Sequence, residues 1–560
     1  MDQHGGLRHV LRSISSPTQL FRPFRGIGVA LLLLAPIAAG SQSAPGAVLP
    51  LTRAEATQFE ETSRYADVMA FLRTVCASSA NLHLTQFGYS SEGRALPLVV
   101  VGADPDPESV RLSGKVRVYL QANIHGGEVC GKEALLLLLR ALATGQHAAW
   151  TDSLVLLIAP IYNADGNERL VLGRAGQYGP FGGNGQRSTA QGYDLNRDHV
   201  KLDSPEARSL IRLLRRFDPH VWVDFHTTNG TYHAYHLTYS PPLHPNTYSP
   251  IDEFLRGQLL PAVTENVLRK HAWDYYYYGN LPPPHAGNLS WVGLSEDAGW
   301  YTFDHRPRYS NSYAGLRNRL GILSEAYSYA TFEERILASL YFAEEILDFA
   351  HARATSIRDL LSRADSHSVV GEELALRATH QRSESPVEIL LSTVTEERNP
   401  YTGAKVFLRT GERQPVKVYE YGRFSATESE SAPRAYFVPP HLAPALDLLS
   451  WHGITSRPVT PAPLRLERFR IDSTAVGEAA YEGHVQVELF GEYESAEVVL
   501  PEGTLEVPLD QPLGRFAFTL LEPRSDDGLV NWGLLGPHLE GQPYYPILRL
   551  PAAGRSDPSR

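Results

Sequence analysis

The first part of the chain alternates between unbroken apolar runs and segments with helical periodicity. The apolar runs have the length and content of strands buried on both faces, and they lie at 96–102, 115–124, 153–161, 220–225 and 320–326. Helical patterns lie between or after them, at 133–143, 204–217 and about 331–362. This rhythm predicts an α/β fold with a mainly parallel sheet flanked by helices.

The pattern changes after about residue 365. Apolar and polar residues alternate at 483–490, 504–509 and 514–521, with Gly, Pro and Asp turns between them, as antiparallel strands do. The stretch 435–453 adds some α/β character. We therefore predict an α/β domain over residues 41–365 and a smaller β-rich C-terminal domain over 380–560, whose role the sequence does not indicate.

Residues 1–40 have the layout of a secretory signal. Four arginines precede the apolar run GIGVALLLLAPIAA, and small residues follow it at 38–40. The run is short for a membrane span, although an uncleaved anchor remains the alternative. We predict an exported protein, periplasmic or secreted, with no integral membrane span once the signal is removed.

Composition and charge narrow the class of protein. With 43% hydrophobic and 20% charged residues, the chain is ordinary globular material. Its formal net charge is −11, and it becomes −14 without the four Arg and one Asp of residues 1–40, which argues against a general nucleic-acid binder. The only cysteines are Cys76 and Cys130, so no disulfide framework is expected. Neither the pairing of these two nor the oligomeric state can be predicted from the sequence.

The segment QANIHGGEVCGKEALLLLLR places His125 and Glu128 where a predicted strand gives way to a helix. Parallel sheets bind their ligands at this edge, and the two glycines allow a sharp turn close to a ligand. Taken alone, the pair is better explained by a turn histidine and a helix N-terminal charge, because a two-residue match is often accidental. The rest of the sequence decides between these interpretations.

Two further residues end predicted strands. His226 closes WVDFHTT, and Glu325 lies in GILSEAYSY. Two His and one Glu are a known ligand set for a catalytic zinc site that keeps its fourth position open. Glu325 would then be the base for the attacking water. A buried carboxylate without a partner is a poor alternative, because an ionised group in an apolar strand must be paired.

Five motifs follow one another along the chain: HGGE at 125–128, YNADG at 162–166, an Arg ahead of DLNRD at 194–198, DFH at 224–226 and SEA at 324–326. In content and order they resemble the zinc carboxypeptidase family, the carboxypeptidase A-like metallopeptidases, over roughly residues 60 to 350. The resemblance implies an α/β fold with a mixed, mainly parallel sheet flanked by helices, and it makes residues 41–365 the catalytic domain.

The resemblance also implies roles for individual residues. His125, Glu128 and His226 would bind one Zn²⁺ per chain, and Glu325 would be the general base. Arg187 matches the residue that polarises the scissile carbonyl and stabilises the oxyanion. Asn196 and Arg197 match the pair that holds the terminal carboxylate, and Asp194 matches the carboxylate that orients the first zinc histidine.

Two regions depart from the family pattern or extend it. The family's mobile tyrosine, which closes over the bound C-terminus, has three candidates here, Tyr301, Tyr309 and Tyr313, of which we expect Tyr313. The aromatic insertion at 273–293 is either a lid or binding wall, or a loop packed on its own rings. His233, His236 and His244 follow the DFH motif, and their spacing favours ordinary histidines over a second metal site.

The sequence thus predicts an exported, zinc-dependent metallocarboxypeptidase that hydrolyses C-terminal peptide bonds of ordinary peptides or of cell-wall peptides. The nearest alternative is an amidase or deacylase on the same scaffold. A non-catalytic binding module and an exported structural or adhesive protein are the alternatives from other classes. The preferred C-terminal residue cannot be predicted.

Overall fold

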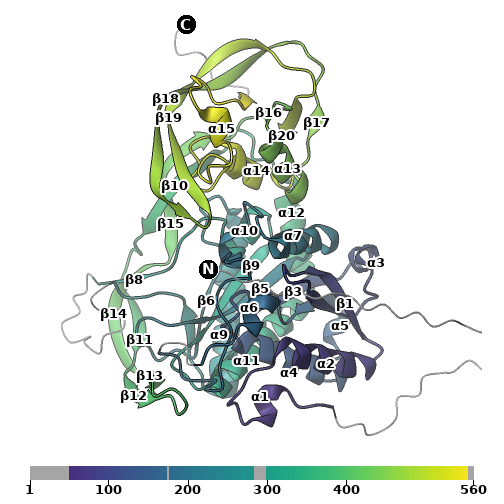
Figure 1. Ribbon diagram of the computed structural model, residues 1–560, viewed down its shortest axis with the longest axis vertical. Helices are drawn as coiled ribbons and strands as arrows, with labels where there is room; N and C mark the ends of the chain where they lie inside the picture. The colour runs from purple at the N-terminus through teal and green to yellow at the C-terminus, as the bar shows by residue number, and fades with distance from the viewer. Residues whose placement is uncertain (1–48, 173–175, 283–297, 553–560) are drawn as a thin grey trace, which may run out of the picture. The chain divides into compact units, whose positions relative to one another are not determined.

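A mixed sheet of eight described strands lies at the centre of the first part of the chain (Figure 1). The computed structural model describes residues 49–172, 176–282 and 298–552, so the predicted signal at 1–40 lies outside them. Across the sheet the strands are β1 (Leu82–Tyr89), β2 (Ala95–Val101), β4 (Leu154–Ala159), β3 (Val116–Ala122), β5 (Val221–Thr228), β9 (Leu320–Tyr327), β6 (Leu237–Ser240) and β7 (Tyr275–Tyr277).

The central strands β4, β3, β5 and β9 run parallel, whereas β2 joins β4, and β6 joins β9, in antiparallel pairs. Every residue of β3, β4 and β5 is buried, because helices cover both faces of a sheet of this kind. The five strands predicted from unbroken apolar runs, and the α/β fold class, are therefore confirmed.

Helices α4 (Cys130–Ala143) and α10 (Ser310–Leu316) lie on opposite faces of the sheet. A side chain at Gly131 of α4 would meet Phe225 of β5, whereas one at Gly321 of β9 would meet α10. Gly321 pairs with Trp222 of β5, which lies three residues before Phe225 on the same strand. Residues an odd number apart on a strand point to opposite faces, so α4 and α10 cover opposite faces of the sheet.

The other helices of this part pack around that core. α11 (Phe332–Ala352) and α2 (Tyr65–Ala77) pack against α4, and α7 (Pro205–Phe217) packs against β1. The helix predicted at 331–362 divides at Arg353 into α11 and α12 (Ala354–Ser366). The remaining helices are α1 (Arg53–Ala56), α3 (Pro107–Leu112), α5 (Trp150–Ser153), α6 (Ala164–Glu168), η1 (Leu195–Arg197), α8 (Ser249–Phe254), η2 (Leu255–Leu259) and α9 (Leu260–His271).

The C-terminal part is rich in antiparallel strands, as predicted. Its largest sheet contains β17 (Arg457–Pro458), β20 (Leu505–Pro508), β16 (Ala435–Val438), β21 (Leu548–Leu550), β18 (Pro463–Tyr481) and β19 (His484–Val499). Smaller sheets pair β10 (Glu373–Gln381) with β15 (Arg423–Ser431), β12 (Val394–Arg398) with β13 (Lys405–Arg409), and β11 (Val387–Leu391) with β14 (Gln414–Tyr421) and β8 (Gly299–Tyr301).

One predicted strand of this part was wrong. Residues 514–521 form helix α14 (Gly514–Leu521), and all eight of them are buried. A strand or a helix is recognised in a sequence by the spacing of its polar positions. This segment is buried on every side and has no polar face, so the apparent alternation in GRFAFTLL was misleading. The mixed character of 435–453 is confirmed by β16 and α13 (Ala443–His452); the short α15 (Gly536–Leu539) completes the part.

The two parts of the chain share a sheet, since β8 from the first pairs with β14 from the second. The boundary that we predict near 365–385 coincides with the passage from α12 to β10 and remains a prediction. Cys76 and Cys130 are buried free thiols, which answers the question of their pairing. Among the described residues, no helix combines the length and apolarity that a membrane crossing requires.

Candidate metal centre

The turn after β3 is shaped by the residues that follow the strand. Asn123 takes a left-handed conformation, φ 63°, and its side-chain amide donates to the carbonyls of His125 and Gly126 at 3.1 and 3.2 Å. A Cβ at Gly126 would lie 2.5 Å from the carbonyl oxygen of Gln186, so only glycine fits there. The turn thereby brings His125 and Glu128 to the carboxyl edge of the sheet.

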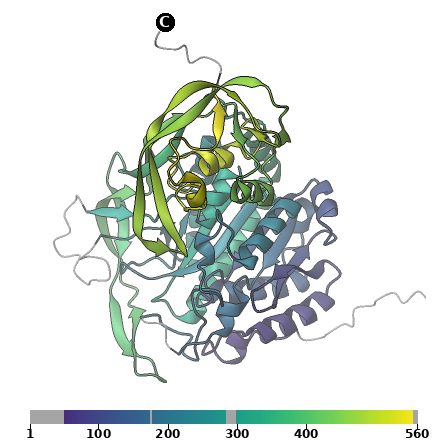
Figure 2. The same ribbon diagram turned by 45° about the horizontal axis from the view of Figure 1, so that its top comes forward.

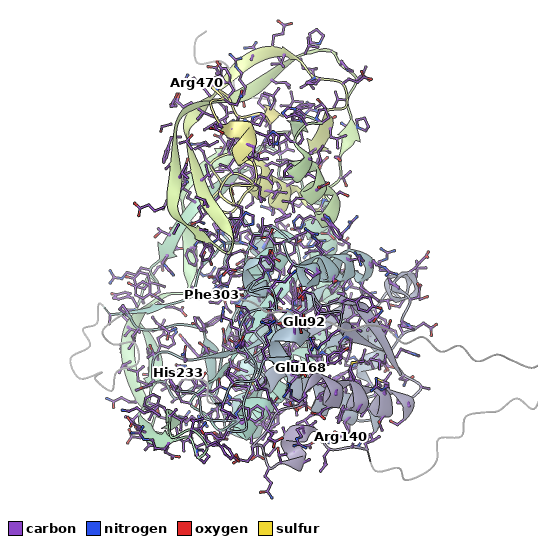
Figure 3. The ribbon with its side chains drawn as sticks, in the orientation of Figure 1. Glu92, Arg140, Glu168, His233, Phe303 and Arg470 are labelled. Atoms are coloured by element: carbon purple, nitrogen blue, oxygen red, sulfur yellow. The ribbon has the colours of Figure 1, made fainter. Side chains whose placement is uncertain are left out.

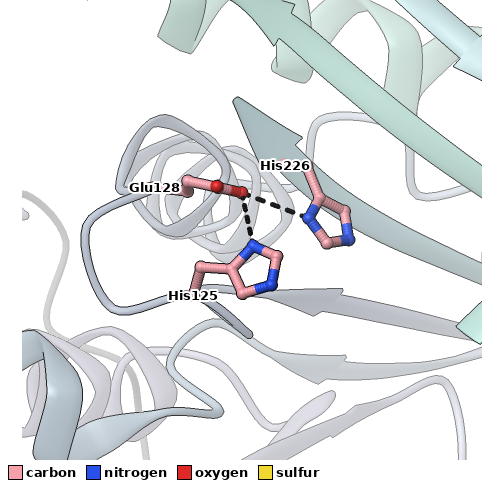
Figure 4. Close-up of side chains that lie close together, drawn as sticks. All are labelled: His125, Glu128 and His226. Carbon is pink, nitrogen blue, oxygen red and sulfur yellow. Dashed lines mark hydrogen bonds and ion pairs between the residues drawn. The ribbon is translucent and has the colours of Figure 1, made fainter. Parts of the chain in front are cut away.

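Three predicted ligands meet at this edge (Figure 4). The Nδ1 atoms of His125 and His226 lie 3.0 and 3.1 Å from the same Glu128 oxygen. All three side chains are buried. Ligand atoms around one tetrahedral zinc are about 3.3 Å apart, so the spacing fits the ion. In the part of the chain that the structure describes, this is the one group of three or more such side chains that could hold a metal.

The two histidines are held so that Nδ1 faces the centre. His125 Nε2 lies 3.1 Å from Asp194 Oδ1, and His226 Nε2 lies 2.9 Å from Asp224 Oδ2. A carboxylate on the far nitrogen fixes the ring and makes the near nitrogen the donor to a metal. Asp194, the carboxylate predicted to orient the first histidine, thus contacts the far nitrogen of His125. Asp224 was missed, although it lies two residues before His226 on one strand and so shares its face.

Glu325 lies directly beside His226, because the two are cross-strand partners in the β5–β9 pair. Its Oε2 is buried and has no hydrogen-bond partner among the described residues. Burial raises the pKa of Glu325 to about 8, with Glu128 adding to the rise while His226 and Arg187 oppose it. A buried carboxylate oxygen without a partner fits a group that acts on a bound water or substrate.

Arg187 faces the same centre from the loop before η1. Its guanidinium donates to Asp194 at 2.8 Å and lies 3.7 Å from Glu128. Burial alone disfavours the charged form, but the carboxylates of Asp194, Glu128 and Glu325 outweigh it and raise the pKa of Arg187. The guanidinium is therefore a fixed positive charge next to the ligand group, with 44% of its side chain exposed.

The YNADG motif joins the two loops that carry these residues. The Asn163 side-chain amide donates to the carbonyls of Ile124 and Arg187, at 3.1 and 3.0 Å. Its oxygen accepts from the Gly166 amide at 2.9 Å. One side chain thus fixes the distance between the His125 turn and the Arg187 loop.

Asn196 and Arg197 lie on η1, one turn from Asp194. The Asn196 side-chain oxygen accepts from the Ser310 amide at 3.0 Å. The Arg197 guanidinium donates through Nη1 to the Asn196 carbonyl at 2.7 Å and stacks 4.1 Å above the Tyr309 ring. The pair is adjacent to the ligand group through Asp194, whose side chain reaches His125.

The placement of Tyr313 corrects the prediction that it closes over the substrate. The Tyr313 side chain is fully buried, and its hydroxyl lies 2.7 Å from His452 Nδ1 in the core. One turn earlier on the chain, Tyr309 takes the place beside Arg197. Sequence distance from the general base could not separate these tyrosines, because Tyr309 precedes α10 in an extended conformation whereas Tyr313 lies within the helix.

The aromatic insertion supplies another tyrosine near Glu325. Residues 275–277 form the edge strand β7, and 283–293 lie outside the described residues. Tyr278 follows β7; burial raises its pKa to about 12, and the Glu325 carboxylate contributes to that rise. Its ring packs edge-on to Phe303, which is labelled in Figure 3. The described portion therefore brings the Tyr278 hydroxyl within electrostatic reach of Glu325.

The histidines after the DFH motif do not form a second metal group. His233 stacks on Tyr327 at 4.0 Å, and His236 stacks on Trp273 at 4.5 Å. Burial lowers the pKa of His233, His236 and His244 to about 3. His233 and His244 are buried and His236 is half-buried, and each is a neutral ring in these surroundings.

Comparison with known proteins points to one family. The zinc carboxypeptidase profile matches residues 68–209. Carboxypeptidase 2 of Trichophyton rubrum is 24% identical over 508 residues, which cover 86% of this chain and 85% of that protein. Carboxypeptidase D of Rattus norvegicus is 33% identical over 162 residues, 24% of this chain and 12% of that protein. A metallo-carboxypeptidase structure from Burkholderia cenocepacia shows 18% identity and a TM-score of 0.37, over 51% of this chain and 69% of that one.

Proposed function

The chain belongs to the zinc carboxypeptidase family, and from that membership we propose that it removes the C-terminal residue of peptides at the centre formed by His125, Glu128 and His226. The observation that carries this proposal is the convergence of both histidine Nδ1 atoms on one Glu128 oxygen, beside the Glu325 carboxylate, whose Oε2 has no hydrogen-bond partner in the described part of the chain. The donor set of two imidazoles and a carboxylate suits one Zn²⁺ per chain.

The chain's own residues divide the chemistry among them. A bound zinc would supply Lewis-acid polarisation of the scissile carbonyl and a lowered pKa for water. Glu325 accepts the proton of the attacking water and returns it to the leaving amine. Arg187, held by Asp194, stabilises the negative charge that develops on the carbonyl oxygen.

Substrate recognition is assigned to η1. The forked Arg197 guanidinium and the neighbouring Asn196 bind the free carboxylate of the peptide, because a planar pair of donors matches a carboxylate in two parallel bonds. An endopeptidase has no use for such a contact.

Product analysis tests the proposal. The mature, zinc-loaded protein is given N-blocked peptides with a free C-terminal carboxylate and the same peptides as C-terminal amides. We expect free amino acids from the acids and at least about 100-fold slower release from the amides. Release of the blocking acyl group instead would support the amidase or deacylase alternative, and absence of any turnover in a zinc-loaded sample would support the binding-module alternative.

Replacing Arg197 by Ala should lower kcat/KM for a free-acid peptide about 100-fold, because a charge-assisted pair of hydrogen bonds to the carboxylate is lost. The rise in KM should account for most of the change, since this contact exists before and during the reaction. Steady-state kinetics on the acid and amide peptides measure it. Arg457→Ala, on an exposed strand with a surface partner, is the control. An unchanged ratio of acid to amide would contradict the assignment.

Replacing Asp224 by Asn should weaken zinc binding about 10- to 100-fold. The carboxylate that fixes His226 Nε2 at 2.9 Å becomes an amide that holds the ring less firmly. Competition with a fluorescent zinc chelator measures the affinity. Asp472→Asn, on an exposed strand, serves as the control. Equal affinities for Asp224→Asn and the unmodified protein would show that the carboxylate does not orient the ligand.

The layout of residues 1–40 supports the further proposal that the protein acts outside the cytoplasm. Cleavage near residue 40 during secretion, read from the N-terminal sequence of the mature protein, tests it. A protein that keeps its N-terminus and stays in the membrane fraction would favour the uncleaved anchor.

A further inference from the structure

The longest hairpin of the chain belongs to the C-terminal part and extends well beyond its own sheet. β18 has 19 residues, which at about 3.3 Å each span about 60 Å. Tyr481 pairs with His484, so Glu482 and Gly483 form the turn at the tip. Residues 472–480 of the approach are exposed along their whole length. Figures 1 and 2 show the two strands running toward the parallel sheet.

The tip of this hairpin contacts the segment that carries the predicted substrate-binding residues. Arg197 Nε donates to the Tyr481 hydroxyl at 3.0 Å. The backbone amide of Asp194 donates to the Glu482 carboxylate at 3.2 Å. A segment more than 280 residues away along the chain thus contacts the backbone of Asp194, the residue whose carboxylate orients His125, and the side chain of the arginine assigned to the substrate.

The hairpin tip, residues 481–484, is seated on a second C-terminal segment. The Tyr481 ring lies roughly parallel to the fully buried Trp532 ring, with centroids 6.0 Å apart. His484 Nε2 lies 2.8 Å from Asp203, just beyond η1. A Cβ at Gly533 would lie 2.5 Å from the Val485 carbonyl, so the backbone approaches as closely as glycine permits. The tip therefore has a defined position, although the strands that carry it are exposed.

Glu482 has an unusual backbone conformation for its residue type. Its φ is +50°, in the left-handed region that two-residue hairpin turns require and that Gly, Asn or Asp adopt more easily. Non-glycine residues held in this region cluster at functional sites. Here the glutamate side chain is used, because its carboxylate reaches the Asp194 amide.

Arg197 is thereby fixed on three sides. Tyr481 accepts from Nε, the Asn196 carbonyl accepts from Nη1, and the Tyr309 ring lies beneath the guanidinium plane. A guanidinium has five N–H donors, and these contacts use one on Nε and one on Nη1, so one on Nη1 and two on Nη2 are left for the two oxygens of a carboxylate. Fixing a forked donor before the ligand arrives reduces the entropy lost on binding.

We propose that the hairpin tip is a wall of the substrate-binding site, in which Tyr481 is a positioning residue that fixes Arg197 for the terminal carboxylate of the peptide. Glu482 anchors the tip to the amide of Asp194. This inference rests on the proposed function, since it takes Arg197 as the carboxylate-binding residue. It gives the C-terminal part of the chain a direct role in recognition.

The test measures preference for a carboxylate rather than activity. An N-blocked tripeptide and its C-terminal amide are titrated into zinc-loaded Glu325→Gln protein, which is expected to bind without cleaving. Their ratio of dissociation constants is the acid preference. Adding Tyr481→Phe removes only the hydroxyl and should lower the preference about 5- to 10-fold, with the affinity for the amide unchanged. Tyr401→Phe, an exposed tyrosine in the β12–β13 turn, should leave it unchanged.

A second variant separates recognition from stability. Glu482→Gly suits the positive φ and should leave the melting temperature unchanged or higher, while it frees the tip and lowers the acid preference. If Tyr481→Phe and Glu482→Gly both keep the full acid preference while Arg197→Ala loses it, the role of the hairpin is overturned and the carboxylate assignment of Arg197 stands. Preference that survives Arg197→Ala overturns the carboxylate assignment on which this inference rests.

Discussion

Replacing Glu325 by Gln should lower kcat about 10³- to 10⁴-fold while the protein still binds zinc. Proton transfer by a well-placed general base contributes 10²- to 10⁴-fold, and this group serves both the attack of water and the departure of the amine. Glutamine has the same shape and cannot accept the proton. Glu325 is not one of the three residues expected to bind the metal, which are His125, Glu128 and His226. Its replacement should therefore leave the metal in place.

The environment of Glu325 suits this role. Its pKa is raised to about 8, mainly by burial; Glu128 and Asp224 contribute to the rise, and His226 and Arg187 oppose it. A cation bound beside it favours the ionised form and lowers the pKa toward the range in which a base is effective. Activity should therefore fall as the pH drops below the pKa of Glu325 in the zinc-bound protein, because the protonated carboxyl cannot accept a proton.

Two measurements together check this expectation. Single-turnover kinetics on an N-blocked peptide report the chemical step, and metal analysis of the same sample reports zinc content. Glu388→Gln, on the exposed edge of β11, is the matched control and should retain full activity. A Glu325→Gln protein that holds zinc and keeps more than about a tenth of the activity would exclude Glu325 as the base.

The sequence located the centre because the chemistry lies at strand ends. Unbroken apolar runs identified β3, β5 and β9, and parallel strands bring their carboxyl ends to one edge. His125 and His226 follow the first two runs and Glu325 lies near the end of the third, so the order of strands in the sheet brings them together. The register that pairs His226 with Glu325 needed the structure, because neither strand carries a polar face that fixes it.

Contacts between distant segments could not be predicted in the same way. Tyr481 and Glu482 lie in an exposed hairpin whose alternating pattern gives no sign of what its tip touches. Tyr313 and Tyr309 differ only by one helical turn, and the packing of α14 and His452 decides which one is buried. Residues 514–521 show the same limit, because their period is hidden by burial on all sides.

Zinc should raise the melting temperature of the mature protein by a few degrees, and His226→Ala should abolish both that rise and the peptidase activity. Four carboxylates surround the two ligand histidines, on Glu128, Asp194, Asp224 and Glu325, and the Arg187 guanidinium faces them as a fixed positive charge. A dication placed among them relieves their repulsion. At free zinc 100 times the dissociation constant, binding stabilises the native state by about 2.7 kcal/mol.

Calorimetry with and without a chelator measures the rise, and added zinc should restore what the chelator removes. His226→Ala deletes one of three ligands, so the remaining pair no longer holds the ion at the concentration used. The exposed His441→Ala is the matched control and should show the full rise. A zinc-dependent rise of the same size in His226→Ala would mean that the metal binds elsewhere. The stabilisation by a ligand depends on its affinity for the native protein, and removing a true ligand lowers that affinity.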